Sequence, residues 1–376
     1  MAEPTSAGPI EEAGRITNLD ALRGVAVFGI LLMNAVSYGL DPAAYFNISL
    51  ANDTPFDWIV GVFGEVFVDQ KFMGVFSLLF GAGIVLFADR ADAKGNRGGW
   101  LSLWRNLLLL GIGALHTWLW EGDILVAYAI ASPFLLLARR LPDRVLAVLG
   151  VALVLLSALV FGITQSIVDA DGAQLGELWF AGGEAPDDSV GSLVIFTFFM
   201  RALGMMLIGV ALFRSGVLSG ERPREYYRRM AVIGLGVGLP LAALGVLITA
   251  LDDFSPGSAL LSMIPNTVGT IPATLGFTAL IILWNMRGES VWRRRIHAVG
   301  RMALTNYLTQ TIIGIIVLRT LFDPDDLNRA WVLLFIVAVW ILQLAWSPWW
   351  LARFRYGPFE WAWRVLTYRR MQPLRR

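Results

Sequence analysis

The stretch that decides the fold reads Arg-Ile-Thr-Asn-Leu-Asp-Ala-Leu-Arg-Gly over residues 15–24 and Val-Ala-Val-Phe-Gly-Ile-Leu-Leu-Met-Asn over residues 25–34. It opens a membrane helix, yet it carries Asp20, Arg23 and Asn34. Arg23 and Asn34 are separated by about three helical turns, so both fall on nearly one face. Ionisable and amide groups are costly in hydrocarbon unless a bundle interior or an aqueous cavity receives them. This face is therefore a functional candidate.

The composition is that of an integral membrane protein. Hydrophobic residues make up 56% of the 376 residues and charged residues only 16%, with a mean hydropathy of +0.63. A soluble domain averages about 25% charged residues. Apolar runs recur, each long enough to cross a hydrocarbon core about 30 Å thick. Alternating strands of about ten residues are absent, which favours helices over a barrel. The predicted fold is an all-α polytopic helical bundle.

Cysteine is absent, and histidine occurs only at His116 and His297. The lack of cysteine excludes disulfides, thiolate nucleophiles and cysteine-ligated metals. With two histidines, a histidine-rich metal site is not expected either, so we predict no metal. Residues 1–14 are polar and lack the basic start and short apolar stretch of a cleaved signal. We expect a flexible cytoplasmic segment there, and a first membrane helix that is retained as an anchor.

Ten apolar segments predict about ten crossings in a single bundle over residues 15–352. The segments are 20–40, 57–88, 102–120, 122–138, 145–165, 191–213, 230–251, 262–286, 299–320 and 330–352. Basic connections at 90–105, 139–144, 214–229 and 287–301 alternate with acidic or neutral ones at 41–56, 121–123, 166–190, 252–258 and 321–328. Basic loops stay in the cytoplasm. Both termini are therefore expected there, with residues 353–376 as a basic tail.

The basic clusters have two interpretations, which the net charge of +1 conceals. One is topology alone, because a positive-inside bias is general. The other is that a cluster also receives anionic lipid or the phosphates of a cytosolic donor. We expect an integral protein of a bacterial plasma (inner) membrane, with membrane lipids as partners and no nucleic acid. The oligomeric state stays open.

Segment 57–88 is too long for one perpendicular crossing, because its helix would measure about 48 Å. A polar interruption inside it contains Glu65, Asp69, Gln70 and Lys71. The interruption indicates either a broken helix or a shallow amphipathic piece that leads into the true span. Desolvated lysine loses its proton readily, unlike arginine. Lys71 has either a functional role or a salt bridge to Asp69 or Glu65.

His116 lies near the end of the third segment, one turn from Glu121 and Asp123. A histidine beside carboxylates can serve as a general base, with one carboxylate fixing its tautomer. The alternative is an interfacial histidine that is hydrogen-bonded in an aromatic belt with Trp118 and Trp120. The depth of His116 and its acidic neighbours support the first interpretation, and both stay open.

Further polar groups interrupt the second half of the chain. Arg201 sits inside the sixth segment, where it must pair or face water. Residues 264–274 carry two prolines and several hydroxyl or amide side chains, which indicate a cavity lining or a kinked packing helix. Asn306 and Tyr307 in the ninth segment have the same two interpretations. Asn306 is also expected to bond across helices.

At these residues the chain resembles the YeiB-type membrane proteins, a family defined as a domain of unknown function. The resemblance covers residues 15–34 with their Leu-Asp-x-Leu-Arg-Gly core, residues 71–83, and residues 116–128. It continues at 300–307 and 356–368, so it spans nearly the whole chain. It implies a membrane bundle and does not by itself imply a reaction.

The opening block is also similar to that of heparan-alpha-glucosaminide N-acetyltransferase, a membrane enzyme that moves acetyl from cytosolic acetyl-CoA to a sugar amine. This resemblance covers Arg15, Asp20, Arg23, Gly24 and Asn34. The catalytic histidine of that enzyme lies shortly after its first helix, whereas this chain has no histidine before His116. Either His116 substitutes from the third segment, or the chemistry differs.

The leading hypothesis is a transmembrane acyltransferase. It takes a cytosolic acyl-CoA, such as acetyl-CoA, as co-substrate and acylates a hydroxyl or amine acceptor, expected on a carbohydrate-like molecule. In this hypothesis His116 is the base, Asp123 or Glu121 orients it, and Lys71 or Arg201 stabilises the oxyanion. The phosphates are held by Arg23 or by Arg293–Arg295. Its catalytic residues are His116, Asp123, Glu121 and Lys71. Its binding residues are Arg23, Asn34, Asp69, Arg201, Asn306, Tyr307, Arg293, Arg294 and Arg295.

The rival hypothesis is a secondary transporter or lipid-handling protein, in which the intramembrane charges form an ion or substrate pathway. Asp69, Lys71, His116 and Arg201 would then act as proton-coupled gates. A third reading is a scaffold whose polar pairs are structural only.

Overall fold

The structure is a computed structural model that describes residues 16–322 and 326–376. Within these ranges the chain is helical and forms no β-strand, apart from one isolated bridge between Phe354 and Arg375. This confirms the predicted all-α fold. The expected flexible segment 1–14 lies outside the described residues.

The long helices follow the predicted apolar segments. They are α1 (Thr17–Asn34), α5 (Lys71–Ala93), α6 (Gly98–Leu119), α7 (Leu125–Ala138), α8 (Asp143–Gln165), α9 (Asp188–Arg214), α10 (Arg224–Leu251), α11 (Met263–Asn285), α13 (Ala303–Thr320) and α14 (Arg329–Leu351). The shorter helices connect or cover them. These are α2 (Val36–Gly39), α3 (Ala43–Phe46), α4 (Pro55–Phe63), α12 (Val291–Arg301) and α15 (Pro358–Tyr368).

Six helical stretches of the described chain are long and apolar enough to cross a membrane. They are Pro55–Ala93, which joins α4 to α5, and helices α8, α9, α10, α11 and α14. Helices α12 and α13 make a seventh if this pair, bent by 82°, counts as one span. The chain is thus a polytopic helical membrane protein. The figure of about ten crossings and the cytoplasmic placement of both termini stay predictions.

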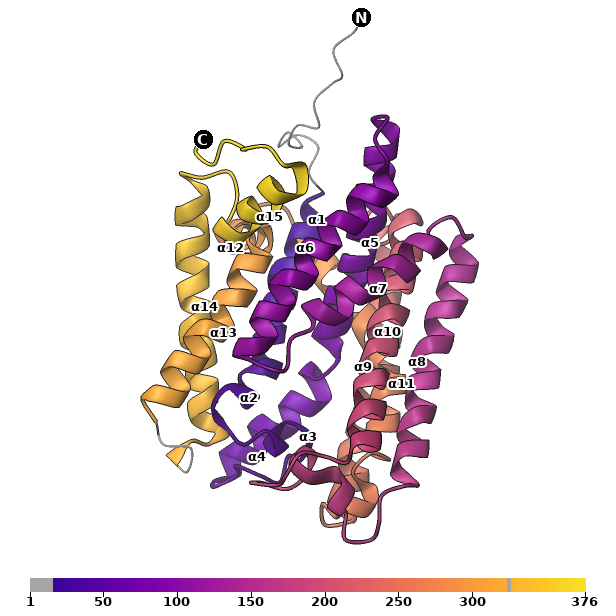
Figure 1. Ribbon diagram of the computed structural model, residues 1–376, viewed down its shortest axis with the longest axis vertical. Helices are drawn as coiled ribbons and strands as arrows, with labels where there is room; N and C mark the ends of the chain where they lie inside the picture. The colour runs from indigo at the N-terminus through magenta and orange to yellow at the C-terminus, as the bar shows by residue number, and fades with distance from the viewer. Residues whose placement is uncertain (1–15, 323–325) are drawn as a thin grey trace, which may run out of the picture.

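The basic connections gather at one end of the molecule. Arg139, between α7 and α8, binds Asp92 at the end of α5 (Nη2–Oδ2, 2.8 Å). The Asn18 amide of α1 donates to the Ser219 carbonyl between α9 and α10 (2.8 Å). Figure 1 shows α12, α15 and the C-terminus at this same end, drawn uppermost. We call it the basic end.

The acidic and neutral connections gather at the opposite end. Asn47, which follows α3, donates to the Trp179 carbonyl between α8 and α9 (3.1 Å). Trp179 in turn donates through Nε1 to the Phe254 carbonyl between α10 and α11 (3.0 Å). Helices α3 and α4 lie here, at the lower end of Figure 1. The alternation of charge at these connections thus corresponds to two ends of one bundle, whereas the acidic α6–α7 turn at 121–123 lies between the ends (Figure 1).

Segment 57–88 is broken into two helices. Helix α4 ends at Phe63 and passes into a π-helical turn over Gly64–Val68. Gln70 then takes a left-handed conformation (φ 62°), and α5 begins at Lys71. Backbone groups that such a break releases need partners inside the protein. The Lys71 ammonium supplies one, because it donates to the Glu65 carbonyl (2.7 Å).

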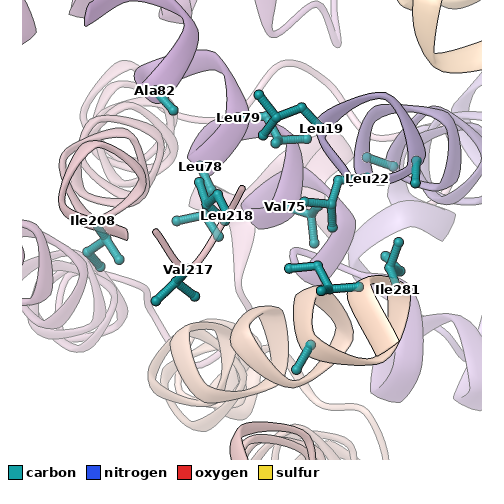
Figure 2. Packing of buried hydrophobic residues seen from close by; sticks show 14 of the residues in the cluster. Leu19, Leu22, Val75, Leu78, Leu79, Ala82, Ile208, Val217, Leu218 and Ile281 are labelled. Atoms are coloured by element: carbon teal, nitrogen blue, oxygen red, sulfur yellow. The ribbon is translucent and has the colours of Figure 1, made fainter. Parts of the chain in front are cut away.

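The core around the site is built on α1 and α5. Leu19 and Leu22 of α1 pack against Val75 and Leu78 of α5 and Ile281 of α11, all of them buried (Figure 2). Close apolar packing of this kind holds the helices that line the site in fixed positions.

Residues 353–376, expected to be a basic tail, pack across the basic end. Helix α15 lies there, and the backbone N–H of Thr305 on α13 donates to Glu360 Oε1 (3.0 Å). Trp363 donates through Nε1 to the Arg105 carbonyl of α6 (2.9 Å). Burial raises the pKa of Glu360 above that of an ordinary glutamate. The C-terminal segment thus helps to enclose the space between α6 and α13.

Candidate functional site

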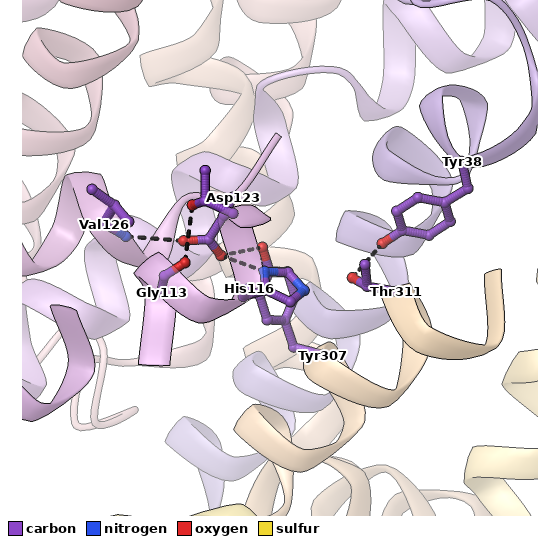
Figure 3. A network of polar contacts seen from close by, with 8 residues as sticks. Tyr38, Gly113, His116, Asp123, Val126, Tyr307 and Thr311 are labelled. Atoms are coloured by element: carbon purple, nitrogen blue, oxygen red, sulfur yellow. Dashed lines mark hydrogen bonds and ion pairs between the residues drawn. The ribbon is translucent and has the colours of Figure 1, made fainter. Parts of the chain in front are cut away.

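His116, Asp123 and Tyr307 form a buried polar cluster, drawn in Figure 3. His116 Nδ1 lies 2.8 Å from Asp123 Oδ1, and the Tyr307 hydroxyl donates to the same oxygen (3.0 Å). The His116 and Asp123 side chains are 3% and 0% exposed. The cluster joins the α6–α7 turn to α13, two parts of the chain that are distant in sequence.

Local structure explains how Asp123 is held. Helix α6 ends at Leu119, and the chain turns back before α7 begins at Leu125. Asp123 Oδ2 accepts the backbone N–H of Val126 in the first turn of α7 (3.0 Å). A carboxylate at a helix N-terminus is favoured by the helix dipole and by these free N–H groups. The turn lies so close to α6 that a Cβ at Gly113 would be 2.9 Å from Val126 N.

The hydrogen bonds indicate which ring nitrogen of His116 carries the hydrogen. An ionised carboxylate only accepts hydrogen bonds, so Nδ1 carries the hydrogen that Asp123 receives. The other ring nitrogen, Nε2, is then the basic one. It is buried and has no hydrogen-bond partner among the described residues. A buried imidazole with a fixed tautomer and an unsatisfied basic nitrogen has the arrangement of a general base.

A cavity of about 430 Å³ leads from the basic end to this cluster. Tyr307 and Leu125 lie in its wall, beside the apolar side chains of Phe76, Phe80 and Leu109. The cavity also has six cationic lining residues: Arg23, Arg90, Lys94, Arg105, Arg301 and Arg364. Its wall therefore combines cations with an apolar interior. Of the three cluster residues, Tyr307 lines the cavity.

Aromatic rings hold two of these cations. The Arg105 guanidinium lies 4.0 Å from the Trp363 ring centroid and 4.6 Å from that of Phe87. Arg364 lies 4.8 Å from the Tyr356 centroid. Cation–π contacts leave the N–H groups at the guanidinium edge available for an anion.

A second polar cluster surrounds the break between α4 and α5. The Lys71 ammonium, whose residue is fully buried, donates to Asn266 Oδ1 (2.6 Å) as well as to the Glu65 carbonyl. The Asn266 amide donates to Asp69 Oδ2 (2.9 Å). Tyr45 donates to the other Asp69 oxygen (3.1 Å). Asn266 thus bridges the lysine and the aspartate.

Arg201 belongs to the same region. It is 1% exposed and donates through Nη1 to Thr267 Oγ1 (3.4 Å). Its guanidinium lies 4.4 Å from the Phe198 ring centroid. Its Nε and Nη2 atoms have no hydrogen-bond partner among the described residues.

An apolar layer separates the two clusters. Met33, Val68 and Met73 are buried together, with Ile124 packed against them. Ile124 follows Asp123, and Val68 precedes Asp69, so the layer lies directly between the clusters. A second, small hollow of about 20 Å³ reaches Glu65 and Asn266 and is also lined by Trp179 and Phe254 of the opposite end. The two clusters therefore face opposite ends.

The remaining predicted residues lie in several places. Arg23 lines the cavity and is 3.4 Å from Asp20 Oδ1. Asn34 ends α1; its carbonyl accepts from Ser37, which accepts from Trp120 in the α6–α7 turn. Glu121 is exposed and is not part of the cluster of His116 and Asp123.

Four other predicted residues stand outside the cavity wall. Asn306 binds Ser347 (3.2 Å) and so links α13 to α14, in the way expected of an interhelical amide. Arg293 donates to the Trp284 carbonyl (2.8 Å). Arg294 pairs with Glu289 (3.8 Å), and Arg295 donates to the Leu344 carbonyl (3.5 Å). None of the four is among the residues that line the described cavity.

Sequence reasoning missed most of the cavity's cations. Arg90, Lys94, Arg105 and Arg364 belong to basic clusters for which the sequence leaves both topology alone and phosphate binding open. Spacing along the chain cannot distinguish them from Arg293–Arg295, because the cavity forms only where α15 folds back onto α6. For metal binding, no group of three or more His, Cys, Asp or Glu side chains gathers anywhere in residues 16–322 and 326–376.

Comparison with known proteins places the chain in a family. Residues 212–370 match the family model "Protein of unknown function (DUF418)". Over 96% of its length the chain is 34% identical to "Uncharacterized protein YeiB" of Escherichia coli (strain K12), covering 98% of that protein. It is 31% identical to "Uncharacterized protein YxaH" of Bacillus subtilis (strain 168), with 96% of both chains covered. The chain belongs to the YeiB-type family of DUF418 membrane proteins.

Proposed function

We propose that this protein is an acyltransferase of the bacterial plasma membrane that takes its acyl group from cytosolic acyl-CoA. The observation that carries the proposal is the cavity of about 430 Å³, with six cationic lining residues and with Tyr307 of the buried polar cluster in its wall. Coenzyme A carries several phosphate charges at one end and a thioester on a long arm at the other. Arginine binds phosphate through paired N–H groups, and the apolar interior suits the arm.

The chemistry assigned to the cluster is acyl transfer to a hydroxyl or amine. The acceptor's O–H or N–H supplies the missing partner of His116 Nε2, which takes the proton as the acceptor attacks the thioester carbonyl. A bond forms from the acceptor to the carbonyl carbon, and the C–S bond breaks. The proton then leaves with the coenzyme A thiolate, which restores the neutral imidazole. Asp123 holds the ring and offsets its transient positive charge.

Tyr307 has the role of oxyanion donor in this proposal. Its hydroxyl hydrogen, which points at Asp123 here, can be shared with the carbonyl oxygen as that oxygen gains charge. The sequence assigned this role to Lys71 or Arg201. Both of these cations lie beyond the apolar layer, so Tyr307 is the better candidate. The acceptor is expected to be carbohydrate-like, on the resemblance of the opening block alone.

A binding measurement tests the proposal. The melting temperature of the purified protein would be followed against coenzyme A, acetyl-CoA and longer acyl-CoAs. A ligand of the folded state at about one hundred times its Kd adds about 2.7 kcal/mol of stability. We expect a saturable rise that is lost in Arg90→Gln/Arg364→Gln and kept in Arg224→Gln/Arg228→Gln, which removes two exposed cations elsewhere at the basic end. No rise with any thioester, in a folded sample, would overturn the proposal.

A second candidate, a secondary transporter, is favoured by one specific observation. Two polar clusters face opposite ends across a thin apolar layer, which is the arrangement needed for access from each side in turn. In that case the buried charges of Asp69, Lys71 and Arg201 would gate a proton-coupled path. Proton-driven uptake into vesicles that contain the purified protein, without any acyl-CoA effect, would favour this candidate.

A further inference from the structure

A second large hollow opens on the side of the bundle; it shares Lys94 with the central cavity and has no part assigned in the proposed reaction. It measures about 1640 Å³ and lies between α6, α7 and the residues that follow α15. Figure 1 shows α6 and α7 together in the middle of the view, with α15 above them. Pockets for small molecules usually measure roughly 300–1,000 Å³. This groove is therefore large enough for a bigger ligand.

The end of the groove at the basic end is positively charged. Lys94 and Arg97 precede α6, and Arg369 and Arg370 follow α15; all four line the groove and are exposed. Among the described residues, none of the four forms an ion pair with a carboxylate, unlike Arg139, which pairs with Asp92. The Arg369 guanidinium instead rests 4.7 Å from the ring centroid of Trp104. Four cations that have no carboxylate partner among the described residues thus lie at one end of the groove.

The walls of the groove are apolar. Leu103, Leu107 and Leu110 lie on α6 at a spacing that forms one stripe along the helix. Ile130 and Phe134 of α7 face them across the groove and are 47% and 53% exposed. The stripe runs from the charged end toward the middle of the bundle. Tryptophan at the charged end is typical of the membrane interface.

From this combination we infer that the groove binds one anionic phospholipid from the leaflet at the basic end. The phosphate headgroup contacts Lys94, Arg97, Arg369 and Arg370, and the acyl chains lie along α6 and α7. Charge complementarity selects an anionic headgroup over a zwitterionic one. The length of the apolar stripe selects a lipid over free phosphate, which would use the cations alone.

The test measures lipid binding to the purified, delipidated full-length protein. Native mass spectrometry would follow the titration of phosphatidylglycerol, phosphatidylcholine and inorganic phosphate. The groove variant is Arg97→Gln/Arg369→Gln/Arg370→Gln, which leaves Lys94 in place because Lys94 also lines the central cavity. The matched control is Arg224→Gln/Arg229→Gln/Arg287→Gln, which removes three exposed cations at the same end but outside the groove.

We expect phosphatidylglycerol to bind at least tenfold more tightly than phosphatidylcholine. The affinity should fall at least tenfold in the groove variant and less than twofold in the control. Equal losses in both variants would mean diffuse surface charge and would overturn the inference. Equal binding of the two lipids, or binding of inorganic phosphate as tight as that of phosphatidylglycerol, would overturn it as well.

A second measurement keeps the inference testable if the groove variant fails to fold. Unmodified protein would be irradiated with phosphatidylglycerol that carries a diazirine in its acyl chain, and the labelled peptides would be mapped. Crosslinks should concentrate in residues 103–110 and 129–134. The exposed apolar face of α8, with Val148 and Leu155, is the internal comparison. Equal labelling of α8 would contradict a specific site.

Discussion

The two buried polar clusters have similar residue types and different geometry. In the cluster at the α4–α5 break, Lys71 has its donors directed at Asn266 and a backbone carbonyl, and Asn266 carries the contact on to Asp69. In the cluster at the α6–α7 turn, His116 is fixed on one side by Asp123 and unsatisfied on the other. The break in the helix accounts for the hydrogen bonds of Lys71, while Arg201 in the same region keeps two buried nitrogens without a partner among the described residues. The buried Nε2 of His116 has no such structural explanation, and its cluster reaches the cavity through Tyr307.

The largest expected effect is on the rate of acyl transfer, which should depend on the cluster of His116. His116→Ala should lower the rate of coenzyme A release from acetyl-CoA, in the presence of an acceptor, about 10²- to 10⁴-fold, because the base is removed. Thiol release in reconstituted vesicles measures it. Glu121→Gln, at an exposed carboxylate two residues from Asp123, is the control and should leave the rate unchanged. Full activity in His116→Ala would mean that His116 is not the base and that the two clusters do not differ in catalytic role.

The next effect is on the free energy of unfolding, which should depend on the cluster of Lys71. Lys71→Met should destabilise the protein by about 2–6 kcal/mol, because each of the two buried acceptors that it leaves unsatisfied costs roughly 1–3 kcal/mol. It leaves Asn266 and the Glu65 carbonyl without their donor. Thermal unfolding in detergent measures it, and His116→Ala should unfold within a few degrees of the unmodified protein. A Lys71→Met protein that is stable but inactive would instead place Lys71 in the reaction.

A smaller effect is expected at Tyr307. Tyr307→Phe keeps the ring and removes one hydrogen bond to Asp123, a bond worth about 1.5–3 kcal/mol when the acceptor is charged. We expect a lower turnover with little change in the affinity for acyl-CoA, because the hydroxyl acts on the reacting carbonyl. Steady-state kinetics separates the two quantities. A change in the affinity for acyl-CoA alone would mean that Tyr307 lines the cavity without taking part in the reaction.

The smallest expected effect tests which arginines bind the phosphates of coenzyme A. Arg294→Gln should leave coenzyme A affinity unchanged and alter stability by less than about 1 kcal/mol, because its exposed pair with Glu289 is weak. Arg364→Gln should weaken coenzyme A binding about tenfold. Isothermal titration compares the two variants. The reverse order would favour a phosphate site at Arg293–Arg295 of α12, which the sequence offered as an alternative to Arg23.

Much of the fold was predictable because it depends on local pattern. Apolar runs predicted the long helices. The polar interruption around Asp69 indicated either a broken helix or a shallow amphipathic piece, and the structure has the break before α5. The charge alternation predicted which connections share an end, except for the α6–α7 turn, which lies between the two ends. These features follow from the cost of burying charges and backbone groups in lipid, which acts on each segment separately.

The candidate site was predictable only in part. His116 and Asp123 are seven residues apart, so their pairing could be anticipated from one helix end and its turn. Tyr307 joins them from α13, and this contact depends on how distant helices pack. The same is true of Arg364, which reaches the cavity because α15 folds back. Pairings between elements distant in sequence are set by tertiary packing, which spacing does not encode.

The absence of cysteine from the chain allows a direct test of the central claim, that the cavity from the basic end receives acyl-CoA. Ser102 lines this cavity, and Ser102→Cys would introduce the chain's one thiol. The measurement is the rate at which a small methanethiosulfonate reagent modifies that thiol, with and without saturating acetyl-CoA. The account predicts that acetyl-CoA slows modification of Ser102→Cys at least tenfold. Ser132→Cys, at a residue that lines the groove between α6 and α7, is the control and should be modified at the same rate with and without acetyl-CoA. An unchanged rate at Ser102→Cys, in folded protein, would contradict it.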